Sequence, residues 1–211
     1  MVLRLHSSQP PIPGIKRHNE TDIWRAASTQ GIAPTLLYAG QLAEFLVSTY
    51  VKTNLPARPQ NNEAVLARVF DLLEHCHKLR VNAASINYSR HVSQYWQTIE
   101  DKGQISNPAL VKKREPMRLL LEALLESDAR TGLCHHDPVV ANFVGNPDKL
   151  YLIDWEFAAR GLLVMDYAAL CIEWGIDDAT IVKRTNIDGD LLSMAKALYE
   201  YLCALWAETS A

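Results

Sequence analysis

Residues 133–157, LCHHDPVVANFVGNPDKLYLIDWEF, contain a dense group of histidine, carboxylate and amide side chains. These polar residues stand beside two short apolar runs that are typical of buried segments. Polar groups are costly near a core unless they are paired or take part in binding or chemistry. We therefore expect this stretch to contain a functional site.

The middle of the stretch predicts a β-hairpin over residues 142–154. GNPDK contains turn-forming residues and separates the apolar runs NFV and KLYLI. If the turn centres on residues 147–148, paired residue numbers add up to about 295, and Asn142 lies opposite roughly residue 153. Asn142 and Asp154 should then meet at the open end of the hairpin, close to Asp137.

Two carboxylates and an amide in this arrangement suit a hard divalent cation such as Mg²⁺. Asn142 and Asp154 could supply oxygen ligands, which leaves Asp137 to accept a proton. Phosphoryl transfer needs this combination, because the protein has to hold metal-bound phosphates in line with a hydroxyl and take up its proton. Each residue alone could merely cap a turn, but capping does not require this spacing.

The same residues form a recognisable motif. His135, Asp137 and Asn142 form HxDxxxxN, and Asp154 in LIDWE follows at hairpin distance. This combination resembles the catalytic and metal-binding loops of the choline kinase and aminoglycoside phosphotransferase superfamily, which has a protein-kinase-like fold. The resemblance implies that Asp137 is the catalytic base and that Asn142 and Asp154 bind the Mg²⁺ that bridges the ATP phosphates. It also implies that His135 braces the loop.

Further segments extend the resemblance over most of the chain, although it is weak between residues 52 and 130. DYAALCIEW, which starts at Asp166, is similar to the Dx(G/A)xxxxEW stretch of choline and ethanolamine kinases. It implies that Asp166 hydrogen-bonds the catalytic loop from below. VLRLH, a following glutamate and GIAPTLLYA resemble the third strand, the next helix and the Gly-Pro start of the next strand. Arg4 and Glu20 thus match the pair that positions the α and β phosphates, whereas without the resemblance they would be read as a surface ion pair.

The acceptor site is expected along the helix that follows the second motif. Glu173 and Trp174 lie about two turns along it, and the opposite wall would be Trp155 or Glu156. An aromatic face and a carboxylate together would bind an ammonium group. A tryptophan in an apolar helix is, however, more often part of the core, and Glu173 could simply pair with a surface cation.

These features favour an ATP-dependent kinase that phosphorylates a hydroxyl of choline or a related amino alcohol, so that its partner is a small, cationic acceptor. One alternative is a weak or inactive kinase-like binding protein, because family members begin with two strands and a phosphate-covering loop before the VLRL strand. Another is a kinase for thiamine or an aminoglycoside. A metal-dependent hydrolase that uses His135, His136 and Asp137 would leave the IDWE hairpin unexplained.

The elements that must position these residues predict an α+β, protein-kinase-like fold with two lobes. Residues 1–51 should form a truncated N-terminal β-lobe that binds nucleotide, with the order strand, helix, strand, strand. Residues 52–211 should form a mainly helical C-terminal lobe that carries the catalytic and metal-binding loops. The apolar spacing predicts helices over the following segments: residues 18–30, 63–79, 116–128 and 190–206.

The composition excludes several other classes of protein. The 211 residues are 48% hydrophobic, and their formal net charge of −3 gives no general attraction to nucleic acid. No apolar run reaches the roughly 18 residues of a membrane helix, so we expect no membrane insertion and a cytoplasmic location. The four cysteines are widely spaced, which indicates neither a zinc site nor a disulfide framework.

Overall fold

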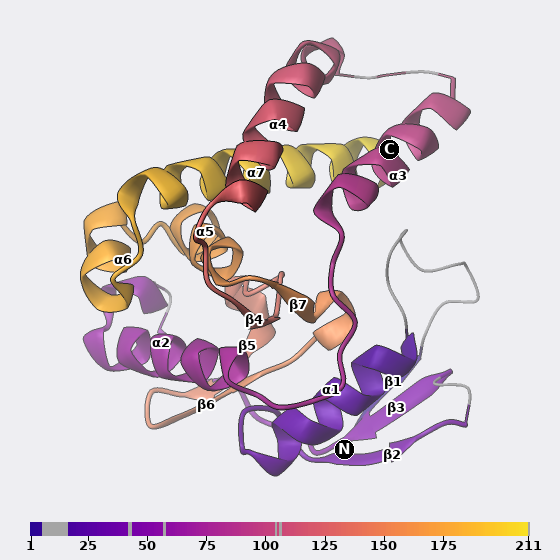
Figure 1. Ribbon diagram of the computed structural model, residues 1–211. Helices are drawn as coiled ribbons and strands as arrows, with labels where there is room; N and C mark the ends of the chain where they lie inside the picture. Colours follow the sequence, from indigo (N-terminus) through magenta and orange to yellow (C-terminus); the bar gives the residue numbers. More distant parts are fainter. Residues whose placement is uncertain (6–16, 42–43, 57, 104, 106, 211) are drawn as a thin grey trace.

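The computed structural model describes residues 1–5, 17–41, 44–56, 58–103, 105 and 107–210. Its N-terminal part is a three-stranded antiparallel sheet with one helix (Figure 1). The sheet has the order β1-β3-β2, and the expected order strand, helix, strand, strand is confirmed. The elements are β1 (Val2–Leu5), α1 (Arg17–Thr29), β2 (Leu36–Ala39) and β3 (Phe45–Ser48). Residues 7–14, which are rich in serine, proline and glycine, lie outside the described residues.

Helix α1 packs on the rest of the molecule through one apolar face. Ile23 and Ala27 are fully buried there, as the spacing predicts. Its Asn19 side chain also joins two segments of the C-terminal part: Nδ2 donates to the Ala158 carbonyl at 3.0 Å, and Oδ1 accepts from the Ala84 amide at 3.1 Å. The helix that carries Glu20 is therefore fixed to the C-terminal part by directed hydrogen bonds.

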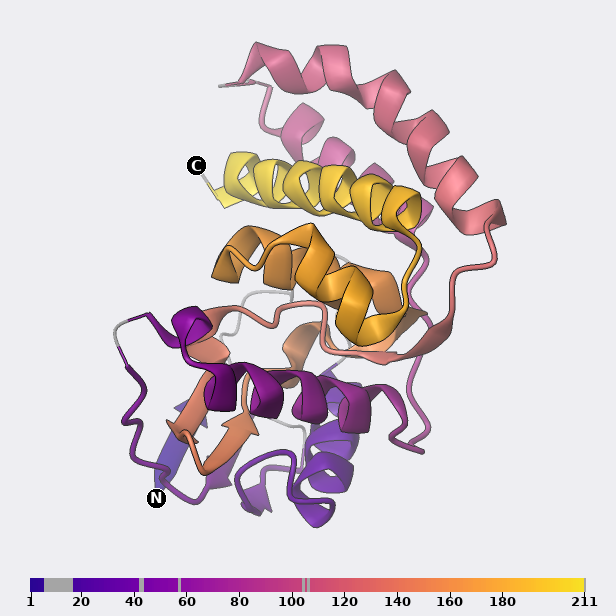
Figure 2. The ribbon, with the colours of Figure 1, turned by 90° about the vertical axis from the view of Figure 1, so that its left-hand side faces the viewer.

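The C-terminal part is mainly helical, as expected. Figure 2 shows α7 lying between α4 and the pair formed by α5 and α6, with α2 on the other side of that pair. The helices are α2 (Glu63–His77), α3 (Tyr88–Asp101), α4 (Pro108–Glu126), α5 (Leu163–Trp174), α6 (Asp178–Thr185) and α7 (Gly189–Ser210). Within the described residues, no helix is long and apolar enough to cross a membrane.

Helix α4 corrects the prediction of a helix over 116–128. It begins eight residues earlier, at Pro108, and Pro116 lies inside it. The Asn107 side chain accepts from the Ala109 amide and caps the helix, while Pro108 occupies a position in the first turn where a missing N–H costs nothing. The sequence signal was ambiguous because Pro116 is equally suited to begin a helix.

Two short antiparallel pairs lie between the sheet and the helices. Strand β4 (Thr131–Cys134) pairs with β7 (Ala159–Leu162), and β5 (Phe143–Asn146) pairs with β6 (Lys149–Leu152). In the second pair Phe143 faces Leu152 and Asn146 faces Lys149, so paired residue numbers add up to 295 as predicted. The loops after β4 and β6 therefore emerge beside each other.

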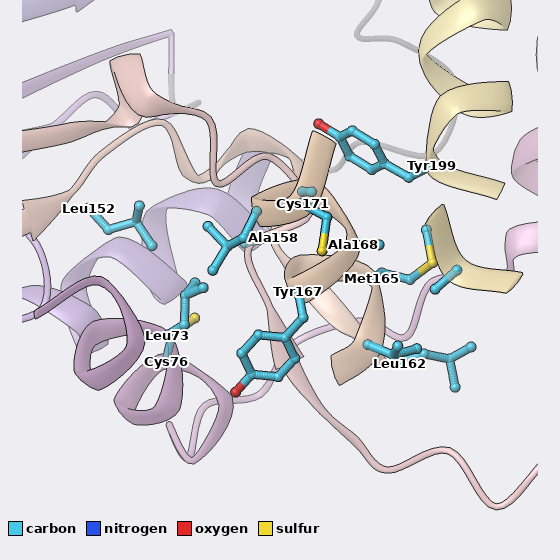
Figure 3. Packing of buried hydrophobic residues seen from close by; sticks show 14 of the residues in the cluster. Leu73, Cys76, Leu152, Ala158, Leu162, Met165, Tyr167, Ala168, Cys171 and Tyr199 are labelled. Atoms are coloured by element: carbon cyan, nitrogen blue, oxygen red, sulfur yellow. The ribbon is translucent and has the colours of Figure 1, made fainter. Parts of the chain in front are cut away.

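The core is built around α5, whose residues from Val164 to Cys171 are all buried. Figure 3 shows Tyr167 extending from α5 to α2, where Leu73 and Cys76 lie, while Tyr199 reaches toward α5 from α7. A helix that is apolar around most of its circumference must be covered on several sides. Because α5 begins with the second motif, its burial fixes that motif in position.

Candidate active site

The loop that follows β4 is anchored from below by a buried carboxylate. Asp166 in α5 is fully buried, and its two oxygens accept the backbone N–H groups of His135 at 2.9 Å and His136 at 2.7 Å. His77 from α2 donates to the same carboxylate, 2.9 Å away, while its other ring nitrogen faces the Tyr167 hydroxyl. Three segments of the chain are therefore joined through one side chain.

This carboxylate stays ionised although it lies in the core. Burial alone would raise the pKa of Asp166, but the hydrogen bond and the charge of His77 outweigh burial and lower the pKa to about 2. His77, Cys134 and Asp166 also have possible metal-ligating atoms within 4.8 Å of one another. The hydrogen bonds of Asp166 and His77 account for that cluster, so it carries no metal assignment.

Asp137 and Asn142 are in direct contact. Asn142 Nδ2 donates to the Asp137 side chain at 2.8 Å and to its backbone carbonyl at 2.9 Å. Asn142 is buried, and its own carbonyl accepts the Ile153 amide at the open end of the hairpin. The amide nitrogen is used by Asp137, which leaves the amide oxygen of Asn142 as the group that could bind a cation.

The carboxylate of Asp137 lies in an acidic environment. Its pKa is raised to about 6, because burial and the charges of Asp154, Glu173 and Glu156 together outweigh the hydrogen bond from Asn142, which lowers it. A carboxylate with this pKa is a suitable proton acceptor near neutral pH. The repulsion among the carboxylates also means that a cation between them would be stabilising.

Asp154 follows β6 in a left-handed backbone conformation, with φ 67°. Such a conformation costs about 1–3 kcal/mol for a residue other than glycine and is often found where a side chain must point into a site. The Oδ1 atom of Asp154 is buried and makes no hydrogen bond of good geometry, although Arg4 Nη1 lies 2.7 Å away as an ion partner. A buried oxygen of this kind fits a ligand of a divalent cation.

Arg4 joins the N-terminal sheet to the site. Its guanidinium lies 2.9 Å from Glu20, 2.7 Å from Asp154 and 3.1 Å from Glu156. Burial lowers the pKa of Arg4, but the three carboxylates outweigh burial and raise it, so the group is a permanent cation. The predicted Arg4–Glu20 pair therefore exists, and it extends directly to the candidate metal ligand.

The histidines of the loop have separate surroundings. His135 is buried, its Nε2 lies 3.0 Å from the Ile153 carbonyl, and its ring packs against Trp155. His136 instead turns toward Tyr88, with its Nε2 atom 2.9 Å from the hydroxyl. The two rings thus have different partners, and they do not form the shared metal-binding set that a hydrolase would need.

A comparison with protein families shows to which family the chain belongs. The phosphotransferase enzyme family matches residues 1–204. The chain belongs to this family. No curated protein matches the chain significantly.

Solved structures of related phosphotransferases share the fold. The choline kinase LicA from Streptococcus pneumoniae superposes with a TM-score of 0.82 at 20% identity, over 99% of this chain and 76% of LicA. LicA in complex with AMP superposes with a TM-score of 0.77 at 21% identity, over 93% of this chain and 71% of LicA. A choline/ethanolamine kinase family protein from Mesorhizobium loti superposes with a TM-score of 0.74 at 19% identity, over 93% of this chain and 72% of that protein. These similarities establish the protein-kinase-like two-lobe fold for this phosphotransferase.

The expected acceptor wall needs one correction. Trp174 is 2% exposed, its indole N–H donates to the Pro138 carbonyl at 2.9 Å and its ring packs against Phe143. Trp155 is fully buried, and its N–H donates to the Leu152 carbonyl. Neither ring is open to a ligand, so both tryptophans are core residues of this phosphotransferase. The apolar character of the segments around them favoured that outcome.

The remaining acceptor candidates, Glu156 and Glu173, have different partners. Glu156 forms an ion pair with Arg4 at 3.1 Å. Glu173 is exposed and accepts a hydrogen bond from Tyr199 of α7 at 3.3 Å. Burial raises the pKa of Tyr199, and the charges of Cys203, Glu173 and Asp137 raise it further. Sequence reasoning missed Tyr199, because its spacing in α7 predicts only a core position.

Proposed function

We propose that this phosphotransferase is an ATP-dependent kinase that phosphorylates the hydroxyl of a small amino alcohol such as choline. The observation that carries the proposal is the meeting of Asp137, Asn142 and Asp154 at the end of one hairpin, with Arg4 beside them. We also infer a cytoplasmic location, which the four free cysteines support.

Asp137 acts as the proton acceptor in this proposal. Asn142 holds one carboxylate oxygen at 2.8 Å, which leaves the other oxygen for the hydroxyl of the acceptor. The hydroxyl gives its proton to Asp137 as its oxygen attacks the γ-phosphorus and the bond to the leaving ADP oxygen breaks. The raised pKa of Asp137, about 6, makes it a stronger base than an ordinary aspartate while leaving it ionised at neutral pH.

The nucleotide side depends on Arg4, Glu20, Asn142 and Asp154. Asn142 and Asp154 would hold Mg²⁺ through their side-chain oxygens, and the ion would offset the negative charge of the ATP phosphates as the bond to the γ-phosphorus breaks. Glu20 holds the Arg4 guanidinium at 2.9 Å, so that its remaining N–H groups can bind phosphate in a fixed direction. LicA, a protein of the same fold, has been solved in complex with AMP, which supports nucleotide binding by this chain.

The acceptor side depends on Glu173. Its exposed carboxylate is held by Tyr199 and lies near enough to Asp137 to raise the pKa of that residue. A cationic ammonium group bound to Glu173 would bring the hydroxyl of a short amino alcohol toward Asp137. The choline and ethanolamine kinases among the solved structures support this class of acceptor.

The test measures ADP release with Mg·ATP and a panel of acceptors: choline, ethanolamine, thiamine and an aminoglycoside. We expect Mg²⁺-dependent turnover with choline or ethanolamine. Asp154→Ala should lose the thermal stabilisation that Mg·ATP gives the parent, since ligand binding raises apparent stability. Asp148→Ala, at the exposed far end of the same hairpin, is the matched control. Phosphorylation of the aminoglycoside alone would contradict the acceptor assignment.

A further inference from the structure

His136 has an unusual backbone for its residue type. It lies in the left-handed region, with φ 64°, directly before Asp137. Residues with a side chain are uncommon in this region and persist there only when their surroundings hold them. The backbone N–H of His136 donates to Asp166, which gives the turn one fixed point. A second fixed point is needed to set the direction of the peptide bond that leads to Asp137.

Tyr88 supplies that second point from helix α3. Its hydroxyl lies 2.9 Å from His136 Nε2 and accepts the Leu162 backbone N–H at 3.1 Å. Tyr88 is 3% exposed, so its own proton needs an acceptor inside the protein. His136 Nε2 can take that proton only if this nitrogen carries none of its own. The contact therefore selects the neutral form of His136 with the proton on Nδ1.

The strand β7 is shaped to admit this contact. A Cβ atom at Gly161 would lie 2.4 Å from the Tyr88 hydroxyl and 2.6 Å from His136 Nε2, closer than real Cβ contacts. Glycine is thus the residue that allows the phenol and the imidazole to meet across the strand. Helix α3, strand β7 and the catalytic loop are joined at this one point.

The rest of the surroundings agrees with a neutral ring. Burial lowers the pKa of His136 to about 4, and the charge of Asp166, which raises it, does not compensate. Nδ1 has no hydrogen bond of ordinary geometry, although an interaction with the Phe157 backbone raises the pKa of the ring.

We propose that Tyr88 and His136 are positioning residues for Asp137. The Tyr88 hydroxyl fixes the His136 ring in its Nδ1–H form and so holds the left-handed turn that orients the next carboxylate. Asp166 holds the backbone of the same turn, and the two anchors together prevent its rotation. The inference rests on the proposed function, in which Asp137 accepts the proton of the acceptor hydroxyl.

The first test does not depend on activity. Nitrogen-15 NMR of histidine-labelled protein at pH 7.5 reports which ring nitrogen carries the proton, and His136→Asn identifies the His136 signals by their loss. We expect Nδ1 to be protonated in the parent and the proton to be shared between both nitrogens in Tyr88→Phe. A parent with the proton on Nε2 would overturn the proposal, whatever reaction the protein catalyses.

The second test measures kinetics with the acceptor that the parent uses. Tyr88→Phe removes only the hydroxyl, and His136→Gly permits the left-handed turn without strain but removes the ring that holds it. Each should lower kcat about fivefold or more with KM for ATP and acceptor within about twofold, and the double variant should be no worse than either single one. Tyr95→Phe, a buried tyrosine of the same helix, is the matched control and should keep the parent kcat.

Additive losses, or equal losses in Tyr88→Phe and Tyr95→Phe, would show that the two residues do not act as a unit. The melting temperature of each variant separates a loss of kcat from a loss of folded protein. If the parent phosphorylates none of the acceptors, the proposed function fails while the NMR result still decides the state of His136.

Discussion

The guanidinium of Arg4 lies 2.7 Å from the carboxylate of Asp154, which joins the first strand of the chain directly to the candidate metal site. Arg4 supplies a positive charge beside the acidic residues Asp154 and Glu156. In the proposed function, a cation bound to Asp154 and the phosphate groups of a nucleotide would lie beside the Arg4 guanidinium. We therefore expect nucleotide binding to depend on the contact that Arg4 makes between the N-terminal sheet and the C-terminal part.

Arg4→Ala should weaken Mg·ATP binding about tenfold, or ~1.4 kcal/mol, and change acceptor binding much less. Glu20→Ala should have a smaller effect in the same direction, because it frees Arg4 without removing its charge. Calorimetric titration with each ligand measures both constants. Arg25→Ala, which removes an exposed arginine paired with Asp22 in the same helix, should bind ATP as the parent does. An equal loss for both ligands would point to misfolding instead.

The pH dependence of turnover should show the state of Asp137. Its pKa is raised to about 6, so the ionised form that can accept a proton is lost as the pH falls through about 6. We expect kcat/KM to be constant above pH 7 and to fall about tenfold per pH unit below the pKa. Added Mg²⁺ should move the acidic limb to lower pH, since a nearby cation favours the carboxylate. A profile that is flat from pH 5 to 8 would exclude a base with this pKa.

Asp166→Asn should destabilise the protein by about 2–4 kcal/mol, because a buried carboxylate that accepts three hydrogen bonds is replaced by an amide. Urea unfolding measures this change, and Asp190→Asn on the exposed start of α7 is the control.

The pH dependence of the parent's free energy of unfolding also tests Asp166. The folded pKa of Asp166, about 2, lies below its ordinary value of 3.8. Its contribution to stability is therefore fully present above about pH 4 and is lost as the pH falls toward 2. An Asp166→Asn variant whose free energy of unfolding stays within about 0.5 kcal/mol of the parent value would contradict the anchoring role of Asp166.

Glu173→Gln should raise the acceptor KM at least severalfold for a cationic acceptor and leave the ATP KM unchanged, since it removes the charge that attracts the ammonium group. Trp174→Phe should instead lower stability and leave the ratio of the two KM values unchanged, because the indole N–H binds the Pro138 carbonyl inside the core. Steady-state kinetics with choline or ethanolamine separates the two effects. A selective rise of acceptor KM in Trp174→Phe would show that the ring contacts the acceptor after all.

The sequence predicted the local parts of the site well. The hairpin register follows from one turn signal, and it brings Asn142 next to Ile153 as expected. Turn formers and apolar runs act over a few residues, so their consequences can be read without knowing the rest of the fold. The order of elements in the N-terminal part was predictable for the same reason.

The tertiary contacts were less predictable. Nothing near Arg4 in the sequence indicates that its guanidinium reaches Asp154 and Glu156 as well as Glu20, because this contact depends on how the two lobes meet. The spacing around Tyr199 predicted only a buried position in the core, although its hydroxyl donates a hydrogen bond to Glu173. The start of α4 was misplaced because Pro116 is tolerated inside a helix that Asn107 had already begun.

The central claim is that Asp137 accepts the proton of the acceptor hydroxyl, and Asp137→Asn tests it most directly. This variant keeps the size of the side chain but removes the base, and calorimetry shows whether Mg·ATP still binds. Phosphorus-31 NMR of parent and variant with Mg·ATP and choline or ethanolamine then follows the phosphorylated product. We predict product in the parent and at least a thousandfold slower formation in the variant, with ATP affinity within about threefold of the parent. Near-normal product formation by Asp137→Asn would contradict the account.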